Sequence, residues 1–393
     1  MTPALRAPGR ETADRSLEVL DDLPHRLLLV GSSARMLAQS GARAGIRPVS
    51  IDLFADRETR ACSAYCEAVN AADIGFERES LLRAAARLAP AGYGYALVYG
   101  SGLDADSAAL EELARGRTLY GNPPEILRLL KTPDAFFETL RRLGIPYPES
   151  SRKLPPDPEN WLLKSARSEG GKGVRPCSRV EPDSSAYYQR RLPGKALSAL
   201  FLANGEDARI IGFNTLRTAG HLVGQPFLFA GAVNRADLTP EQRRQVQTYV
   251  ARLARAVSLR GLNSLDFMLD GETCRVLEVN PRPSATMALY DDDFPHGLLA
   301  AHIRACRGEM PDEMAASGTV RAFKVFFAPF DLEVSEETRW PEWCTDTPVT
   351  GTRIGVGQPV CTVCAEGTDQ RQVECLIERL ESELFERLYA ARS

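Results

Sequence analysis

Residues 264–282 read SLDFMLDGETCRVLEVNPR, which is two alternating runs of apolar and polar residues that meet at a glycine. Successive side chains of a strand point to opposite faces. The apolar face holds Leu265, Phe267 and Leu269 on the first run, and Leu277 and Val279 on the second. The opposite face holds Asp266 on the first run, and Val276, Glu278 and Asn280 on the second. The stretch therefore predicts a β-hairpin with one apolar face and one face that carries acid and amide groups.

The register of this hairpin decides whether its acidic residues form a site. A two-residue turn at Asp270-Gly271 would pair Leu269 with Glu272 and would separate the two carboxylates onto opposite faces. A three-residue or bulged connection puts both carboxylates on one face and also brings the apolar residues together. We predict the longer connection, and a tight two-residue loop without a bulge would remove the argument for a metal site.

In that register Asp266, Glu278 and Asn280 converge as three oxygen ligands. Two carboxylates about 5 Å apart repel by roughly 3 kcal/mol at an effective dielectric constant of about 20, so a cation or a proton is needed between them. Hard oxygen ligands without a nearby His or Cys favour Mg²⁺, with Mn²⁺ as the alternative. The competing interpretation is an acidic hairpin edge that faces solvent.

A second pattern is the loop KSARSEGGKGV at residues 164–174, which contains Gly170, Gly171 and Gly173. Glycines let backbone N–H groups approach phosphate oxygens, and residues 165–174 are predicted to close as a lid. The loop does not match a Walker A motif. Taken alone, it also fits a mobile surface loop.

Three cations accompany these two patterns. Lys131 precedes a predicted helix start at Thr132-Pro133, and Lys164 ends a predicted strand just before the glycine loop. Arg282 lies two residues beyond Asn280 and offers a planar fork suited to a phosphate. Each is most often a surface charge, but together with the acidic hairpin they indicate a nucleotide site.

The segments before and after these motifs predict a multidomain chain of mixed α/β and α+β class. Apolar runs at residues 26–30, 48–54 and 95–99 predict strands, and the first is followed by a glycine turn and an alanine-rich helical pattern. Alternating strands and helices predict an open parallel α/β domain over residues 25–115. Residues 1–24 are predicted to be a flexible leader, residues 116–312 a two-lobed domain, and residues 313–393 a small β-rich domain with a closing helix.

Composition limits the function. The 393 residues are 44% apolar and 25% charged, which is typical of soluble globular proteins of several units. A net charge of −4 gives no basic field for nucleic acid, and no apolar run is long enough to span a membrane. Nine dispersed cysteines, with the Cys361/Cys364 pair lacking partner ligands for zinc, favour a reducing compartment. We expect a cytoplasmic enzyme with neither nucleic acid nor membrane as a partner.

In order and spacing, these motifs resemble the ATP-grasp superfamily over residues 25–312. The motifs are Lys131 with the helix end at 144–146, Lys164 with the glycine loop, QRRLPG at 189–194, Asp266, and EVNPR at 278–282. The resemblance implies an ATP-grasp fold with a pre-ATP-grasp domain in front and a small C-terminal domain behind.

The resemblance also implies roles for these residues. ATP would lie between two lobes with Lys131, Lys164 and the loop glycines on its phosphates, and with backbone groups from Gln189 to Leu192 on its adenine. Asp266, Glu278 and Asn280 would hold magnesium, and Arg282 would steady the transferred group. Lys195-Ala196 follow Gly194 where many relatives have an acidic residue for ribose.

The segments at 52–56 (DLFAD) and 280–284 (NPRPS) and the C-terminal piece look like the carboxylate–amine ligase branch that includes tyramine–glutamate ligase of methanofuran biosynthesis. This likeness implies an ATP- and Mg²⁺-dependent ligase that joins a carboxylate, such as that of glutamate, to an amine through an acyl phosphate. The alternatives are a small-molecule kinase or carboxylase that uses the same nucleotide site, and a nucleotide-binding regulatory protein. The oligomeric state is left open.

Overall fold

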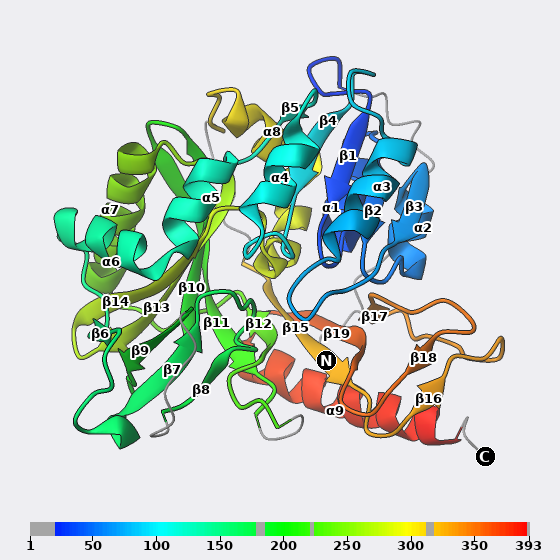
Figure 1. Ribbon diagram of the computed structural model, residues 1–393. Coiled ribbons are helices and arrows are strands. Elements are labelled where there is room, and N and C mark those ends of the chain that lie inside the picture. Colours follow the sequence, from blue (N-terminus) through cyan, green and yellow to red (C-terminus); the bar gives the residue numbers. More distant parts are fainter. Residues whose placement is uncertain (1–19, 178–184, 221–223, 312–317, 391–393) are drawn as a thin grey trace.

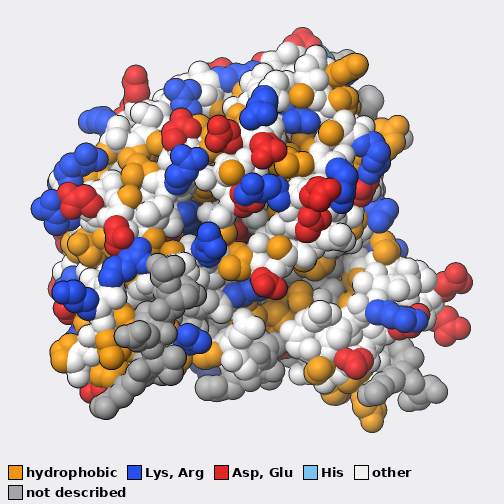
Figure 2. Space-filling view, viewed as in Figure 1, with side chains coloured by type: hydrophobic (Ala, Val, Ile, Leu, Met, Phe, Trp, Pro, Cys, Tyr) orange, Lys and Arg blue, Asp and Glu red, His pale blue; other side chains and the backbone are white. Residues whose placement is uncertain are grey.

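The computed structural model describes residues 20–177, 185–220, 224–311 and 318–390 (Figure 1). Residues 1–19, which make up most of the predicted leader, therefore lie outside the described part. No helix within the described ranges is long and apolar enough to cross a membrane. Figure 2 shows Lys and Arg side chains interspersed with Asp and Glu over the visible face, rather than a field of one sign.

The first unit is an open parallel sheet, as the alternating pattern predicts. Its order is β3-β2-β1-β4-β5, and every pairing is parallel. The strands are β1 (Leu27–Val30), β2 (Val49–Asp52), β3 (Tyr65–Ala68), β4 (Ala96–Tyr99) and β5 (Thr118–Leu119). The helices are α1 (Arg35–Arg43), α2 (Arg57–Cys62), α3 (Arg78–Leu88) and α4 (Ser107–Ala114). The carboxyl ends of these strands form the edge at which ligands of open α/β sheets bind.

The largest sheet is antiparallel, and in the described residues it has eight strands in the order β14-β13-β10-β11-β12-β15-β19-β17. The strands are β10 (Leu197–Asn204), β11 (Ala208–Thr218), β12 (Phe229–Val233), β13 (Arg260–Asp270), β14 (Thr273–Asn280), β15 (Val320–Phe327), β17 (Cys344–Thr345) and β19 (Pro359–Gly367). Because β12 pairs with β15 through Gly231 and Lys324, the hydrogen-bonded sheet continues across the domain boundary predicted at residue 312.

Helices cover both faces of this sheet. They are α7 (Pro240–Val257), α8 (Gly297–Cys306) and α9 (Gln370–Ala390), with short 3-10 turns η2 (Ala285–Leu289) and η3 (Asp291–Asp293) before α8. Two consecutive residues of β10 show the arrangement. Phe201 packs in the core under α7, whereas Leu200 packs in the core under α8. Helix α9 lies along β15 and β19 at the other end of the sheet (Figure 1).

A smaller sheet carries the glycine loop. Its order is β6-β9-β7-β8, and the loop connects β7 to β8. The strands are β6 (Ser150–Ser151), β7 (Trp161–Ser165), β8 (Val174–Pro176) and β9 (Ala186–Arg190), with η1 (Pro158–Asn160) before β7. Helices α5 (Pro124–Lys131) and α6 (Pro133–Arg142) precede this sheet, and β16 (Leu332–Glu333) pairs with β18 (Arg353–Ile354) near the C-terminus.

The β13–β14 hairpin pairs Asp266 with Glu278 as predicted, but this register does not come from the predicted turn. Asp266 lies directly across from Glu278, and Ser264 lies across from Asn280, as the site requires. The expected longer turn is wrong, because Asp270 pairs with Thr273 and leaves a tight two-residue loop. The register instead shifts within the strands, at the pair after Asp266.

This β-bulge has a consequence for the two faces of the returning strand. An extra residue in one strand reverses the facing of everything beyond it. The structure therefore corrects the simple alternation: Val276 is fully buried in the core under α7, whereas Leu277 lines the cavity on the opposite side. The bulge lets the apolar core and the carboxylate pair coexist in one hairpin.

Candidate active site

A cavity of about 2020 Å³ lies where the first unit, the small sheet and the large sheet meet. Ten of the eleven sequence-predicted site residues line it: Lys131, Lys164, Gly170, Gly171, Gln189, Leu192, Asp266, Glu278, Asn280 and Arg282. Gly173 is the exception. A side chain at Gly173 would collide with Ser168, whose Oγ would lie 2.3 Å from the added Cβ, so this glycine allows the loop to pack on itself.

The carboxylates of Asp266 and Glu278 meet on the cavity face of the hairpin. Burial and the adjacent Glu278 raise the pKa of Asp266 to about 8. Burial also opposes ionisation of Glu278, but Lys131 and Lys164 outweigh it and lower the pKa of that carboxyl. Asn280 completes the group, with its Nδ2 3.3 Å from an Asp266 oxygen. One of these two acids is thus held protonated unless a cation replaces the proton.

The donor set at this point fits a small hard cation. Two carboxylates and one amide oxygen suit Mg²⁺, which usually binds through one or two carboxylates together with phosphate oxygens and water. No group of three or more His, Cys, Asp or Glu residues in the described ranges could hold a metal on its own. An ion here would therefore need nucleotide oxygens to complete its coordination.

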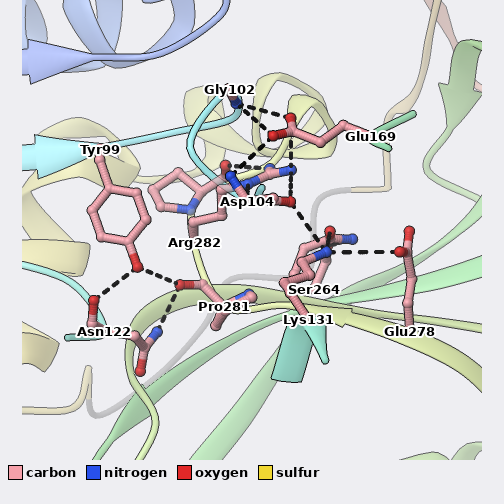
Figure 3. A network of polar contacts seen from close by, with 12 residues as sticks. Tyr99, Gly102, Asp104, Asn122, Lys131, Glu169, Ser264, Glu278, Pro281 and Arg282 are labelled. Carbon is pink, nitrogen blue, oxygen red and sulfur yellow. Dashed lines mark hydrogen bonds and ion pairs between the residues drawn. The ribbon is translucent and has the colours of Figure 1, made fainter. Parts of the chain in front are cut away.

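Lys131 joins this hairpin to the first unit. Its ammonium group lies at the end of α5, 2.6 Å from Asn280 Oδ1, 3.1 Å from Asp104 Oδ2 and 3.7 Å from Glu278 Oε2 (Figure 3). Burial disfavours the charged form, but Asp104 and Glu278 outweigh it, so the pKa of Lys131 is raised. A buried, fully charged ammonium beside the carboxylates is suited to a phosphate ligand.

Arg282 does not point freely into the cavity, because its fork is held by Asp104. The guanidinium donates from Nε and Nη2 to the two Asp104 oxygens at 2.7 and 2.8 Å. Both side chains are almost fully buried, at 8% and 5% exposed. Asp104 was missed from the sequence, although its position just after the carboxyl end of β4 was the available signal.

On the small sheet, Lys164 and Gln189 form a pair across β7 and β9. Lys164 Nζ donates to Gln189 Oε1 at 3.1 Å and lies 5.9 Å from the centre of the Tyr187 ring. Gln189 in turn donates to Ser150 Oγ at 3.2 Å. The Gln189 side chain therefore orients Lys164 toward the cavity. This role is separate from the adenine contact that the resemblance implies for the backbone of this segment.

The glycine loop lies closed against its surroundings. The Phe229 N–H donates to the Gly170 carbonyl at 2.8 Å, and Gly171 (φ +80°) lies so close to Phe227 that a Cβ would be 2.0 Å from that residue's carbonyl oxygen. Glu169, which was not predicted as a site residue, reaches the first unit and accepts hydrogen bonds from the backbone N–H groups of Gly102 and Asp104.

A second buried ion pair forms the far wall of the cavity. Arg35 of α1 donates from Nε to Asp346 Oδ1 at 2.7 Å, and Ser33 Oγ donates to the same oxygen at 3.1 Å. Burial opposes both charges, but each partner offsets it: Asp346 raises the pKa of Arg35, and Arg35 lowers the pKa of Asp346. This pair joins the first unit to the C-terminal strands.

Comparison with known proteins finds a family match and several structures of the same fold. The model of a family described as the ATP-grasp domain matches residues 135–286. The arginine-specific large chain of carbamoyl phosphate synthase from Halalkalibacterium halodurans is 23% identical over 235 residues. That match covers 52% of this chain but only 22% of the relative, so the chain spans about a fifth of that protein's length.

Two solved structures show the same fold over most of the chain. The biotin carboxylase domain of 2-oxoglutarate carboxylase from Hydrogenobacter thermophilus, solved as a dimer with MgADP, ADP and bicarbonate, has a TM-score of 0.68 at 14% identity and covers 88% of this chain and 86% of its own. N5-carboxyaminoimidazole ribonucleotide synthetase from Thermus thermophilus has a TM-score of 0.66 at 16% identity and covers 91% and 98%. These likenesses concern the fold.

Proposed function

Because this chain belongs to the ATP-grasp superfamily, we propose that it is a Mg²⁺- and ATP-dependent ligase that joins a carboxylate to an amine. The observation that carries the proposal is the bulged hairpin, which sets Asp266 across from Glu278 on the cavity wall. Lys131 and Lys164 lie on the same cavity, and both lower the pKa of Glu278. A site with paired acids and paired lysines is suited to a metal-bound triphosphate.

In this proposal each residue has a positioning or electrostatic task. Asp266, Glu278 and Asn280 would hold magnesium, which supplies neutralisation of phosphate charge when it is bound. Lys131, Lys164, Gly170 and Gly171 would contact the phosphates, and the segment from Gln189 to Leu192 would hold the adenine. Gly173 serves the loop's own packing.

The proposed reaction transfers the γ-phosphoryl group of ATP to a substrate carboxylate. The resulting acyl phosphate is attacked by the amine, which forms the amide and releases phosphate, while ADP is the other product. Arg282 neutralises charge on the transferred group, and Asp104 holds its guanidinium in place. A first choice of substrates is glutamate with tyramine, as in assembly of a furan-type one-carbon cofactor.

A carboxylase or carboxylating synthetase is the second candidate, and it is favoured over a kinase because the structural neighbours include a biotin carboxylase domain and a carboxyaminoimidazole ribonucleotide synthetase. In such an enzyme bicarbonate, instead of a substrate carboxylate, would accept the phosphoryl group. The two functions differ in product. ADP release that requires bicarbonate and yields a carboxylated product would replace the ligase proposal.

The test is an ADP-release screen of carboxylates, with glutamate first, each combined with tyramine, tyrosine and other amines, followed by mass measurement of the product. Glu278→Gln keeps the size of the side chain but removes the proposed ligand charge, so ADP release should fall at least about a hundredfold. Glu272→Gln, in the exposed turn of the same hairpin, is the matched control and should behave as the parent chain.

Two results would contradict the proposal. Glu278→Gln with the parent rate and the parent Mg²⁺ dependence would remove the metal site. A stable phosphorylated product without an amide would indicate a kinase. Replacing Mg²⁺ by Mn²⁺ in the same assay determines whether the site accepts both ions.

A further inference from the structure

Glu169 of the glycine loop lies in a pocket that has the features of an anion-binding site (Figure 3). Its Oε2 accepts from the Gly102 N–H at 2.8 Å, and its Oε1 accepts from the Gly102 and Asp104 N–H groups at 3.1 and 3.0 Å. Arg282 Nη2 lies 3.7 Å from Oε2. Two backbone N–H groups, from residues two positions apart, are thus aimed at one carboxylate, and converging backbone N–H groups of this kind also bind phosphate.

The pocket is built into the first unit rather than created by the loop. It follows β4 at the carboxyl edge of the parallel sheet, where ligands of such sheets bind. Gly102 has φ +101°, and a Cβ there would lie 2.6 Å from the Phe76 ring and 2.7 Å from Ser32 Oγ. Only glycine fits this turn without strain, so the two N–H groups are held in place whether or not Glu169 is present.

Glu169 is held less tightly by cations than Asp104, the other carboxylate beside Arg282. Asp104 has two hydrogen bonds from Arg282 and an ion pair with Lys131 at 3.1 Å, whereas the nearest cationic nitrogen to Glu169 is at 3.7 Å. Burial and the neighbouring Asp104 raise the pKa of Glu169. Ionised Glu169 is therefore costly to keep in this pocket, and it should be exchanged for another anion more easily than Asp104.

We propose that the Gly102–Asp104 amide pocket beside Arg282 is the subsite for the substrate's anionic group, and that Glu169 occupies it as a built-in competitor. The substrate carboxylate, and the acyl phosphate made from it, would displace the Glu169 side chain. Because Glu169 precedes two glycines with left-handed φ, at +60° and +80°, its displacement also frees the loop from the first unit. Entry of the substrate and release of the lid are then one event.

This inference rests on the proposed function only for the identity of the displacing group. The pocket should bind simple anions without any turnover, so inorganic phosphate is the probe. Trypsin reports the position of the loop, since Arg167 and Lys172 are exposed and flank Glu169. Cleavage at these two sites, assigned by mass, is followed in phosphate and in chloride at equal ionic strength.

The expected result is that phosphate accelerates cleavage of the parent chain at both sites whereas chloride does not. Glu169→Ala should be cleaved several-fold faster in either salt. If Glu169 fills the pocket about nine-tenths of the time, removing it should tighten the phosphate Kd measured by calorimetry about tenfold. Glu159→Ala, which removes an exposed carboxylate just before β7, is the matched control and should match the parent chain in both assays.

Equal phosphate Kd values for Glu169→Ala and the parent chain, or parent cleavage that is the same in phosphate and chloride, would overturn the inference. The second measurement needs no variant, so it holds even if Glu169→Ala folds poorly. If the chain is an active ligase but Glu169→Ala binds phosphate no more tightly than the parent chain, only the role of Glu169 as a competitor is refuted. If Glu169→Ala binds phosphate more tightly but the chain does not turn over ATP, only the ligase proposal is refuted.

Discussion

Two buried arginine–aspartate pairs can be compared directly in this molecule. Arg282–Asp104 and Arg35–Asp346 both have an Nε to Oδ1 distance of 2.7 Å, and both join segments far apart in the chain. Their surroundings differ. Asp346 is 25% exposed and also accepts from Ser33, while Arg35 has a further bond to Gln39. The Arg35 pair thus has hydrogen bonds with neutral side chains, and the carboxylate of Asp56 acts electrostatically on both of its partners.

The Arg282 pair is crowded by other charges. Lys131, Glu169 and Glu278 all lie within 4.0 Å of a charged atom of this cluster. Three carboxylates here face two cations, so any further phosphate needs metal or a departing acid to balance it. Two ion pairs of the same geometry can therefore serve different purposes. We expect the Arg35 pair to stabilise the cavity wall, and the Arg282 pair to hold a guanidinium beside the phosphoryl group that is transferred in the proposed reaction.

The largest effect is expected from Arg282→Ala, which tests whether the Arg282 pair acts in catalysis and differs in this from the Arg35 pair. Turnover should fall about a hundredfold to a thousandfold, because a preorganised donor to the transferred group is lost. ATP binding should stay largely intact, since Lys131 and Lys164 remain. Steady-state ADP release and equilibrium ATP binding are measured below the unfolding temperature. Parent turnover in this variant would show that the Arg282 pair is merely structural.

Arg35→Ala should lower stability and leave turnover largely unchanged. Removing one partner of a buried pair leaves Asp346 uncompensated, and the free energy of unfolding should fall by about 3 kcal/mol, near the low end for such losses because Asp346 is partly exposed. Turnover per folded molecule should change only a few-fold. Urea unfolding measures the loss, and Asp346→Asn with the double variant completes a cycle. A large fall in turnover with unchanged stability would show that both pairs serve catalysis.

A change of pH separates both pairs from a third buried group, His302. The carboxylates of the two pairs have lowered pKa values, but burial lowers the pKa of His302 from 6.5 to about 4. Leu262 N–H donates to its Nδ1 at 2.8 Å, so the neutral ring is held in place. Between pH 6.5 and 4 the unfolded chain binds the extra proton, so the contribution of His302 to stability should fall by about 3 kcal/mol as the pH is lowered through this window, whereas the raised pKa of Asp266 acts in the opposite direction.

The measurement is urea unfolding from pH 7 to pH 4. His302→Gln should be less stable than the parent chain at pH 7, and this difference in stability should shrink as the pH is lowered to 4, whereas exposed His25→Gln should follow the parent chain at every pH. A slope in His302→Gln equal to that of the parent chain would show that His302 does not cause the acid sensitivity in this window, since the ion-pair carboxylates with lowered pKa values stay ionised there.

The smallest effect is expected at an exposed pair. Arg255 and Asp207 are 3.2 Å apart, but their side chains are 76% and 71% exposed. Arg255→Ala should change the free energy of unfolding by no more than about 0.5 kcal/mol, because water and salt screen the pair. A loss comparable with that of Arg35→Ala would mean that burial does not explain the first comparison.

Much of the fold follows from local patterns in the sequence. The parallel unit follows from strand and helix periodicity, and the pairing of Asp266 with Glu278 follows from the requirement that Leu265, Phe267 and Val279 share a face. What alternation could not place is the extra residue, because a tight turn with a bulge and a longer turn give the same pairing of carboxylates. Consequently Val276 and Leu277 were assigned to the wrong faces.

The missed site residues have a common physical reason. Asp104, Glu169 and Asp346 meet their partners only through tertiary packing, and no local spacing connects Arg282 with Asp104 or Arg35 with Asp346. Arg282 was predicted as a free phosphate clamp because its position past Asn280 is readable from the chain, whereas its partner is not. The roles assigned to the predicted site residues remain proposals until they are tested.

The continuous eight-stranded sheet also bears on how this chain is made in the cell. Strand β12 can pair with β11 on one side early in synthesis, but its other edge waits for β15, since Gly231 pairs with Lys324. An unpaired edge strand is a template for pairing with other chains. While the ribosome translates the intervening α7, hairpin and α8, the nascent chain therefore exposes this edge, and we expect chaperone dependence to end once β15 has emerged.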